Sequence, residues 1–180
     1  MRRWREGDRE SFAAMNADPE VMRYFPQARD RAASDALVDL IEARFQEQGY
    51  GLWALERLED EAFLGFTGLN PMPPDTPGAG EMEVGWRLAR FAWGQGYATE
   101  AAVEVLRTGF ETAALPRIWS ITAVANVRSQ AVMRRLGLRE HSRYLHPSLP
   151  SEHELALQVA YCIDCPAWVP RNPDSAATAG

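Results

Sequence analysis

Residues 81–88 most constrain the fold, because apolar and polar side chains alternate there without a break ahead of a glycine turn. Alternation with a period of two is typical of a β-strand that has one face on the core. The apolar set is Met82, Val84, Trp86 and Leu88, and the polar set is Glu81, Glu83 and Arg87. We therefore predict a strand whose two carboxylates and guanidinium lie on the side away from the core.

A turn with two glycines, Gly94 and Gly96, follows this strand and leads into a helical pattern. The inner face of that helix carries Ala102, Val105, Leu106 and Gly109. A strand, a glycine turn and a helix start form an anion site, because unpaired N–H groups and the positive end of the helix dipole converge there. The alternative is a tight turn that only feeds a core helix. Thr99 replaces the third Rossmann glycine, so dinucleotide binding is not supported.

The other segments predict a mixed α/β domain built around one sheet. Short helices are expected after Asp8 and after Asp18-Pro19, and a longer one at 32–48 has a stripe of Leu37, Leu40, Ile41 and Phe45. Segments 52–55 and 63–67 predict an antiparallel hairpin. A strand at 118–124, a helix at 126–136 and an alternating strand at 155–163 complete the order.

Length and charge limit the organisation of the chain and its partners. A length of 180 residues, against roughly 150 per domain, predicts one domain at 1–165 and a disordered tail at 166–180. The net charge of −6 argues against binding to nucleic acid or to an anionic membrane. No apolar run approaches the ~20 residues of a membrane span, and the charged start is unlike a signal peptide. We expect a soluble cytoplasmic protein, either a monomer or a homodimer.

Two features of the composition exclude classes of enzyme. The 19 basic residues are all arginine, and without lysine a Schiff-base enzyme, a pyridoxal-phosphate enzyme and a P-loop NTPase each lack an essential group. Cys162 and Cys165 form a lone C-x-x-C pair, without the further ligands that a zinc site needs. We therefore expect no metal site.

Three motifs, in the same order, strongly resemble the GNAT acyltransferase superfamily, and most closely its branch of ribosomal-protein N-terminal acetyltransferases. They are Glu83-Val84-Gly85-Trp86-Arg87-Leu88, Trp93-Gly94-Gln95-Gly96-Tyr97-Ala98-Thr99-Glu100-Ala101, and Asn126-Val127-Arg128-Ser129 ending in Leu136-Gly137-Leu138. The resemblance covers about residues 3–161. It implies an α/β GNAT fold, which is a single mixed, mostly antiparallel sheet flanked by helices, with splayed central strands.

The chain departs from the superfamily pattern at three places. Phe91 stands three residues before the first turn glycine, where the wider pattern has arginine or glutamine. Met133 stands seven residues after Asn126, where many members have a tyrosine acid. The first edge strand that the resemblance predicts is barely present ahead of Trp4.

The resemblance implies acetyl-CoA as the acyl donor and assigns its binding residues. The backbone of Gln95, Gly96, Tyr97, Ala98 and Thr99, preceded by Gly94, is the expected pyrophosphate cradle. The splayed strand contributes Trp86, Arg87 and Leu88, with a freed N–H near Arg87 or Leu88 for the thioester carbonyl. Asn126 is expected to bond the pantetheine arm, and it is equally a good N-cap for the helix that begins at Val127.

Acyl transfer to an amine also needs a base for the ammonium proton and an acid for the leaving thiolate. By resemblance, Ser129 is the hydroxyl best placed as the acid; the alternative is a serine that only satisfies its own backbone. Glu83 can act as the base through a water, or be a plain surface or ion-paired carboxylate beside Arg87. His146 is the other candidate base, because imidazole titrates near neutrality, or else an exposed loop histidine.

Together these expectations describe an N-acetyltransferase that transfers the acetyl group of acetyl-CoA directly to a primary amine. No cysteine lies in the motif region to carry an acyl-enzyme. The acceptor that the resembled branch implies is a protein or peptide N-terminus. The alternatives are a small-molecule amine, such as a polyamine, an amino sugar or an aminoglycoside, and a non-catalytic acyl-CoA-binding module.

Overall fold

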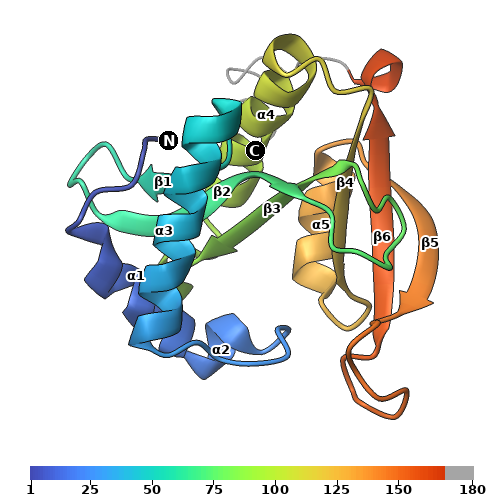
Figure 1. Ribbon diagram of the computed structural model, residues 1–180, viewed down its shortest axis with the longest axis horizontal. Coiled ribbons are helices and arrows are strands. Elements are labelled where there is room, and N and C mark those ends of the chain that lie inside the picture. Colours follow the sequence, from blue (N-terminus) through green and yellow to red (C-terminus); the bar gives the residue numbers. More distant parts are fainter. Residues whose placement is uncertain (169–180) are drawn as a thin grey trace.

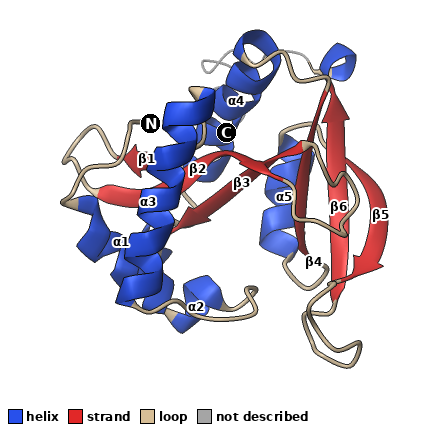
Figure 2. Ribbon diagram, in the orientation of Figure 1, coloured by secondary structure: helices blue, strands red, loops and turns tan. Residues whose placement is uncertain are grey.

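A computed structural model of the chain describes residues 1–168 and contains one six-stranded sheet (Figures 1 and 2). The strands are β1 (Leu52–Glu56), β2 (Phe63–Pro71), β3 (Met82–Leu88), β4 (Arg117–Ala123), β5 (Arg139–Leu145) and β6 (Leu157–Asp164). Their order across the sheet is β1-β2-β3-β4-β6-β5. Only β3 and β4 are parallel neighbours. This is the mixed, mostly antiparallel sheet that the sequence predicts.

Helices cover both faces of the sheet. One face of β1 and β2 packs against α1 (Asp8–Ala17), α2 (Pro19–Met22) and α3 (Arg31–Gln48). The other face packs against α4 (Tyr97–Arg107) and α5 (Val127–Arg135). Three short helical turns, Arg90–Ala92, Thr108–Thr112 and Cys165–Ala167, extend or follow these elements. Because both faces are covered, a polar side chain that points away from α4 is not thereby exposed.

The helix ends follow the sequence signals in most places. The carboxylate of Asp18 accepts the N–H of Glu20 at 2.8 Å, with Pro19 in the first turn, and Gly49 ends α3 with a φ of 77°. Asp8, predicted as an N-cap, is instead the first residue of α1 and forms an ion pair with Arg2 at 2.7 Å.

The predicted apolar stripe of α3 was partly wrong. Val38, Ile41 and Phe45 are buried, whereas Leu40 is 47% exposed. Val38 takes its place because it lies three residues before Ile41 and seven before Phe45, on the same side of the helix.

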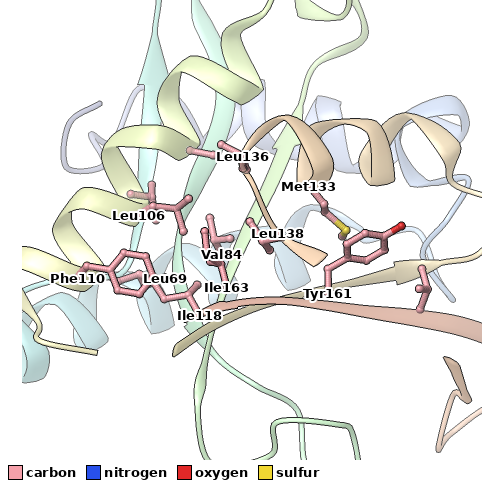
Figure 3. Packing of buried hydrophobic residues seen from close by; sticks show 13 residues of the cluster. Leu69, Val84, Leu106, Phe110, Ile118, Met133, Leu136, Leu138, Tyr161 and Ile163 are labelled. Carbon is pink, nitrogen blue, oxygen red and sulfur yellow. The ribbon is translucent and has the colours of Figure 1, made fainter. Parts of the chain in front are cut away.

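The larger core lies between the sheet and the pair α4 and α5 (Figure 3). Its members include Leu69, Val84, Leu106, Ile118, Met133 and Tyr161. Gly109 lets the continuation of α4 approach β4 closely, because a Cβ there would lie 2.5 Å from Cδ1 of Ile118. This core holds α4 and α5 against the strands.

The two ends of the described chain are tied to the domain. Arg2 exchanges two backbone hydrogen bonds of 3.0 Å with Ala54, so the expected first strand is reduced to a single bridge. Trp168 packs on Phe110 with ring centroids 5.3 Å apart, three residues past the predicted boundary at 165. Most of the tail predicted at 166–180 lies outside the described residues. Within residues 1–168, no helix combines the length and apolar character needed to span a membrane.

Strand β5 has no counterpart in the sequence prediction. Its residues, Arg139–Leu145, are mostly exposed and include three charged side chains, so no apolar alternation marks them. The strand forms because it pairs along the edge of β6. It brings Tyr144 and His146 to a shallow pocket that Ile121 and the loop at 73–76 also line.

Candidate active site

Strands β3 and β4 separate soon after they begin to pair. Their parallel pairing is limited to two positions, where Met82 lies opposite Ile118 and Glu83 lies opposite Trp119. Beyond these positions β3 continues along β2 and β4 along β6, and the two strands diverge visibly in Figure 1. The splayed central strands expected from the sequence are therefore present.

The hydrogen bonds at the two ends of β3 show which backbone groups face this divergence. The carbonyl of Glu81 accepts the N–H of Met72 at 2.9 Å, and the N–H of Ala89 donates to the carbonyl of Leu64 at 2.8 Å. The register between β2 and β3 is unbroken between these bonds. Because neighbouring residues in an antiparallel ladder alternate in direction, odd-numbered residues of β3 face β2 and even-numbered residues face β4.

This alternation directs the backbone of Trp86 and Leu88 toward the divergence, while that of Arg87 faces β2. The carbonyl of Leu88 accepts the indole N–H of Trp93 at 2.8 Å. The N–H groups of Trp86 and Leu88 are thus the donors of this strand end that can meet an oxygen between the strands. Of the two positions predicted for the thioester carbonyl, the geometry favours Leu88 over Arg87.

The glycine turn before α4 has the open shape that an anion needs. Gly94 and Gly96 have φ values of 77° and 87°, in the left-handed region, and a Cβ built at either meets no atom within 4 Å. The side-chain amide of Gln95 donates to the carbonyl of Phe91 at 2.8 Å and braces the turn. Both glycines are therefore required by conformation, and the space over them is free.

The first turn of α4 determines which cradle donors are free. The N–H groups of Thr99 and Glu100 both donate to the carbonyl of Gly96, at 2.9 and 3.0 Å. The N–H groups of Tyr97 and Ala98 precede these and have no intrahelical acceptor. Tyr97 and Ala98 can therefore donate to a phosphate, whereas Thr99 can contribute its hydroxyl rather than its backbone.

The start of α5 lies against the cradle turn. The guanidinium carbon of Arg128 lies 5.3 Å from the centroid of the Trp93 ring. This contact links the first turn of α5, at the end of β4, to the turn that follows β3. The predicted cradle and the predicted residues of α5 thus flank the same opening.

Asn126 caps α5. Its Oδ1 accepts the N–H of Ser129 at 3.2 Å, and its Nδ2 donates to Oγ1 of Thr122 at 3.1 Å. The capping role that the sequence allowed is therefore present. To form a hydrogen bond with a pantetheine arm, Asn126 must therefore use its backbone groups or give up one of these two side-chain hydrogen bonds.

Ser129 lies in the first turn of α5 and is half-buried. Its hydroxyl makes no hydrogen bond to another residue in the described part of the chain, so it is free to donate to a ligand. Met133, one turn further, is fully buried in the core beside the ring of Tyr161 (Figure 3). The thioether of Met133 packs in the core and has no proton to donate.

Glu83 lies on the face of β3 opposite α4 and is held by Asn70. The Nδ2 of Asn70 approaches Oε1 of Glu83 at 3.4 Å. Burial raises the pKa of Glu83 to about 7, although this hydrogen bond acts in the opposite direction. A carboxyl group with a pKa near neutrality can exchange a proton under physiological conditions, which a general base requires.

Asn70 is itself oriented by α3. Arg44 donates to Oδ1 of Asn70, which turns the amide nitrogen toward Glu83 and toward the carbonyl of Pro71 at 3.1 Å. The amide can therefore only donate to Glu83 and favours its ionised form.

His146 follows β5 directly and is half-buried. Its Nδ1 accepts the N–H of Ser148 at 3.2 Å. A shallow pocket of about 240 Å³ is lined by His146, Tyr144 and Ile121, together with the proline-rich loop at 73–76. Burial, and then the charge of Glu83, raise the pKa of Tyr144 to about 12. Tyr144 thus lies near both candidate bases.

The prediction that Arg87 lies on the side of its strand away from the core was wrong. The sequence prediction set Glu83 and Arg87 on the side away from the core, but that side of β3 packs under the N-terminal helices, and Arg87 is only 8% exposed. Nor does Arg87 pair with Glu83, because its hydrogen bond goes to Asn16 of α1.

Sequence reasoning did not identify Tyr144, Asn70 or Arg44. Tyr144 precedes His146 by two residues, a spacing that sets both on one face only once β5 is recognised as a strand. Asn70 and Arg44 belong to segments that carry no motif. Within residues 1–168, no three histidine, cysteine or acidic side chains gather as metal ligands would. Cys162 lies in β6, and Cys165 begins the short helical turn after it.

Comparison with known proteins identifies relatives of this fold. Residues 1–139 match the family model described as the acetyltransferase (GNAT) domain. The FsC-acetyl coenzyme A-N(2)-transacetylase of Aspergillus fumigatus is 31% identical over 137 residues, which cover 72% of this chain and 57% of that protein.

Two solved structures share the fold at lower sequence identity. The spermidine N-acetyltransferase of Vibrio cholerae, in complex with CoA and spermine, is 17% identical with a TM-score of 0.73 and covers 92% of this chain and 95% of that one. The ribosomal-protein-alanine N-acetyltransferase of Brucella melitensis is 16% identical with a TM-score of 0.71, over 91% and 98% of the two chains.

Proposed function

The chain belongs to the acetyltransferase (GNAT) domain family and is an acetyl-CoA-dependent N-acyltransferase, and on that premise we propose that its acceptor is the primary amine of a protein or peptide N-terminus. The observation that carries an amine acceptor is the carboxyl group of Glu83, which is partly buried, is contacted by Asn70 and has a pKa of about 7, on the face of β3 opposite α4. An amine that enters from that face meets a base before it reaches the acyl group.

The residues around the splayed strands fit acetyl-CoA. We infer that the N–H groups of Gly96, Tyr97 and Ala98 hold the pyrophosphate, because the turn is open and these donors lie at the positive end of α4. The even-numbered N–H groups of Trp86 and Leu88 are suited to stabilise negative charge on the carbonyl oxygen. When bound, acetyl-CoA supplies the activated acyl group.

Proton movement completes the proposed mechanism. Glu83, ionised and oriented by Asn70, takes a proton from the acceptor ammonium through a water. His146 is the alternative base, since it lines the same pocket as Tyr144, whose pKa burial and then the charge of Glu83 raise. Ser129 donates a proton to the thiolate of the leaving coenzyme A. Its hydroxyl, which makes no hydrogen bond to another residue within 1–168, and its place in the first turn of α5 support that role.

A small-molecule amine is the second candidate acceptor. One structure with this fold is a spermidine acetyltransferase solved with spermine, and the carboxyl groups of Glu81, just before β3, and Glu83, in β3, suit polyamines and aminoglycosides as well as an N-terminal ammonium group. The alternatives therefore differ in the shape and charge of the acceptor rather than in the reaction.

Release of coenzyme A thiol from acetyl-CoA, measured over a panel of acceptors, tests the proposal. The panel contains extended peptides with a free α-amine, the same peptides with a blocked α-amine and an internal lysine, spermidine, an amino sugar and an aminoglycoside. Turnover of the free-amine peptides but not of the blocked ones is expected. The contrary result is a higher kcat/KM for spermidine, the amino sugar or the aminoglycoside than for every peptide. It would show that the enzyme acetylates small-molecule amines.

A further inference from the structure

Arg87 and Glu83 border an open position on β3. Gly85 lies between them on the same face, and a Cβ built there meets no atom within 4 Å. At about 3.3 Å of rise per residue, the Cα atoms of Glu83 and Arg87 stand roughly 13 Å apart. The strand therefore carries no side chain at Gly85, and this open position lies between the carboxyl group of Glu83 and the guanidinium of Arg87.

The contacts of Arg87 leave one edge of its guanidinium unused. Nη1 donates to Oδ1 of Asn16 at 2.6 Å, and the rings of Phe25 and Phe66 lie 4.0 and 5.4 Å from Cζ. Nε is buried and has no hydrogen-bond partner in the described part of the chain. Nε and Nη2 together form the edge of a guanidinium that binds a carboxylate through two parallel hydrogen bonds.

The charge of Arg87 also lacks a partner. Burial, and to a smaller extent the positive charge of Arg29, lower the pKa of Arg87 to about 10, and no carboxylate of residues 1–168 acts in the opposite direction. A buried ion without a counter-ion is unfavourable, because it loses its hydration without gaining an opposite charge. The backbone N–H of Arg29 donates to the carbonyl of Asn16 at 3.3 Å, which keeps a second cation beside the first. Such a pair of cations favours an anion supplied from outside the chain.

We propose that Arg87 binds a carboxylate of the acceptor, so that the preferred acceptors are peptide N-termini with an acidic side chain close to the amine. The amine lies over Gly85 toward Glu83, and the carboxylate meets the Nε and Nη2 edge of Arg87. This inference rests on the proposed function and narrows its substrate class. It disfavours polyamines, because all their charges repel Arg87 and Arg29.

The first test uses the unmodified enzyme and pairs of short peptides. Each pair has the same free α-amine and the same length, and differs only in aspartate or asparagine at the second position. We expect the KM of the aspartate peptide to be at least tenfold lower, with a similar kcat, because the carboxylate contributes to binding rather than to chemistry. Equal KM values for the two peptides overturn the inference.

Substitutions then assign the preference to Arg87. Arg87→Gln should abolish the difference between the two peptides and leave the affinity for acetyl-CoA unchanged. Arg87→Lys keeps the charge but loses the planar edge, so it should recover only part of the preference. Arg23→Gln is the matched control, because it removes an exposed arginine beside α2 and should keep the full preference. Thermal melting shows whether each variant is folded.

The outcomes separate this inference from the proposed function. Peptides that are acetylated without regard to charge overturn the role of Arg87 and leave the peptide acceptor standing. Acetylation of spermidine or an aminoglycoside, with no peptide modified, overturns both. An equal loss of activity toward both peptides in folded Arg87→Gln also overturns the inference, because it assigns Arg87 a purely structural role.

Discussion

Ser120 donates its hydroxyl hydrogen to the carbonyl of Val84 at 2.9 Å, at the point where β4 parts from β3. The carbonyl of Val84 faces β4, but the backbone pairing of the two strands stops one residue earlier. A side chain thus replaces the next backbone bond of the sheet. The bond satisfies a buried carbonyl while letting the strands diverge, and the divergence is what exposes the N–H groups of Trp86 and Leu88.

Replacement of Ser120 by alanine should destabilise the fold by about 1–2 kcal/mol, because it leaves the buried carbonyl of Val84 without its partner. Urea denaturation measures the free energy of unfolding. Ser142→Ala is the control: this half-buried serine on the edge strand bonds only to the neighbouring His141, so its loss should cost less than about 0.5 kcal/mol. Equal losses in the two variants would refute the role given to Ser120.

The cradle can be tested with two glycines of similar conformation. Gly96→Asp brings a carboxylate to the proposed pyrophosphate position, so affinity for acetyl-CoA should fall at least tenfold, or roughly 1.4 kcal/mol. Gly49 also has a positive φ and open space around its Cβ, but it ends α3. Gly49→Asp should cause comparable backbone strain and leave binding intact. Calorimetric titration with acetyl-CoA compares them, and unchanged affinity in folded Gly96→Asp would move the cradle elsewhere.

Ser129→Ala removes the hydroxyl proposed to protonate the leaving thiolate. We expect kcat to fall by roughly 10²-fold, with little change in affinity for acetyl-CoA, because the interaction is made only as the thiolate forms. Ser151→Ala, at an exposed loop position, should retain wild-type kcat. Full activity in Ser129→Ala would indicate that water or another group supplies the proton.

The choice of base predicts the acidic limb of the pH dependence of kcat/KM. Because Glu83 acts in its ionised form and its pKa is about 7, kcat/KM should fall as the pH drops below about 7. Glu83→Gln should remove this limb and lower the plateau, whereas His146→Ala should leave it in place. If the limb disappears only in His146→Ala, the base is the histidine. If the limb is unaltered in both variants, its cause is the pKa of the acceptor amine itself.

The spacing of apolar residues along the sequence predicted those strands and helices that have one apolar face and one polar face. The strand predicted at 81–88 and the helix predicted at 32–48 were found with nearly correct bounds, and a helix follows Gly96 as predicted. It failed at β5, because an edge strand with charged side chains has no apolar period. It also failed at Leu40, where several apolar residues compete for one helix face and only the packed structure decides between them.

The chemistry of the site was predictable in kind but not in detail. The motifs indicated the glycine cradle, and the residue types indicated a base and an acid. Three details depend on long-range contacts. These are the register that turns the N–H of Arg87 toward β2, the burial of its side chain under α1 and Phe25, and the orientation of Asn70 by Arg44. Such contacts join segments that no local pattern relates.

The raised pKa of Glu83 predicts how stability depends on pH. Below about pH 4.5, its ordinary pKa, the group is protonated in the folded and unfolded chains alike. Between that pH and about 7 the unfolded chain releases the proton while the folded chain keeps it, so the free energy of unfolding falls. The total loss above pH 7 is roughly 3 kcal/mol at about 1.4 kcal/mol per pH unit.

Glu83→Gln removes this loss because glutamine carries no charge at any pH. The variant should therefore match the wild type near pH 4 and be more stable by roughly 2–3 kcal/mol at pH 8, measured by urea denaturation at both values. Glu59→Gln, at an exposed position in the turn between β1 and β2, should show the same difference from the wild type at both pH values. If Glu83→Gln behaves like Glu59→Gln, the carboxyl group of Glu83 is solvated in the folded chain. It would then lack the near-neutral pKa on which its role as the base depends.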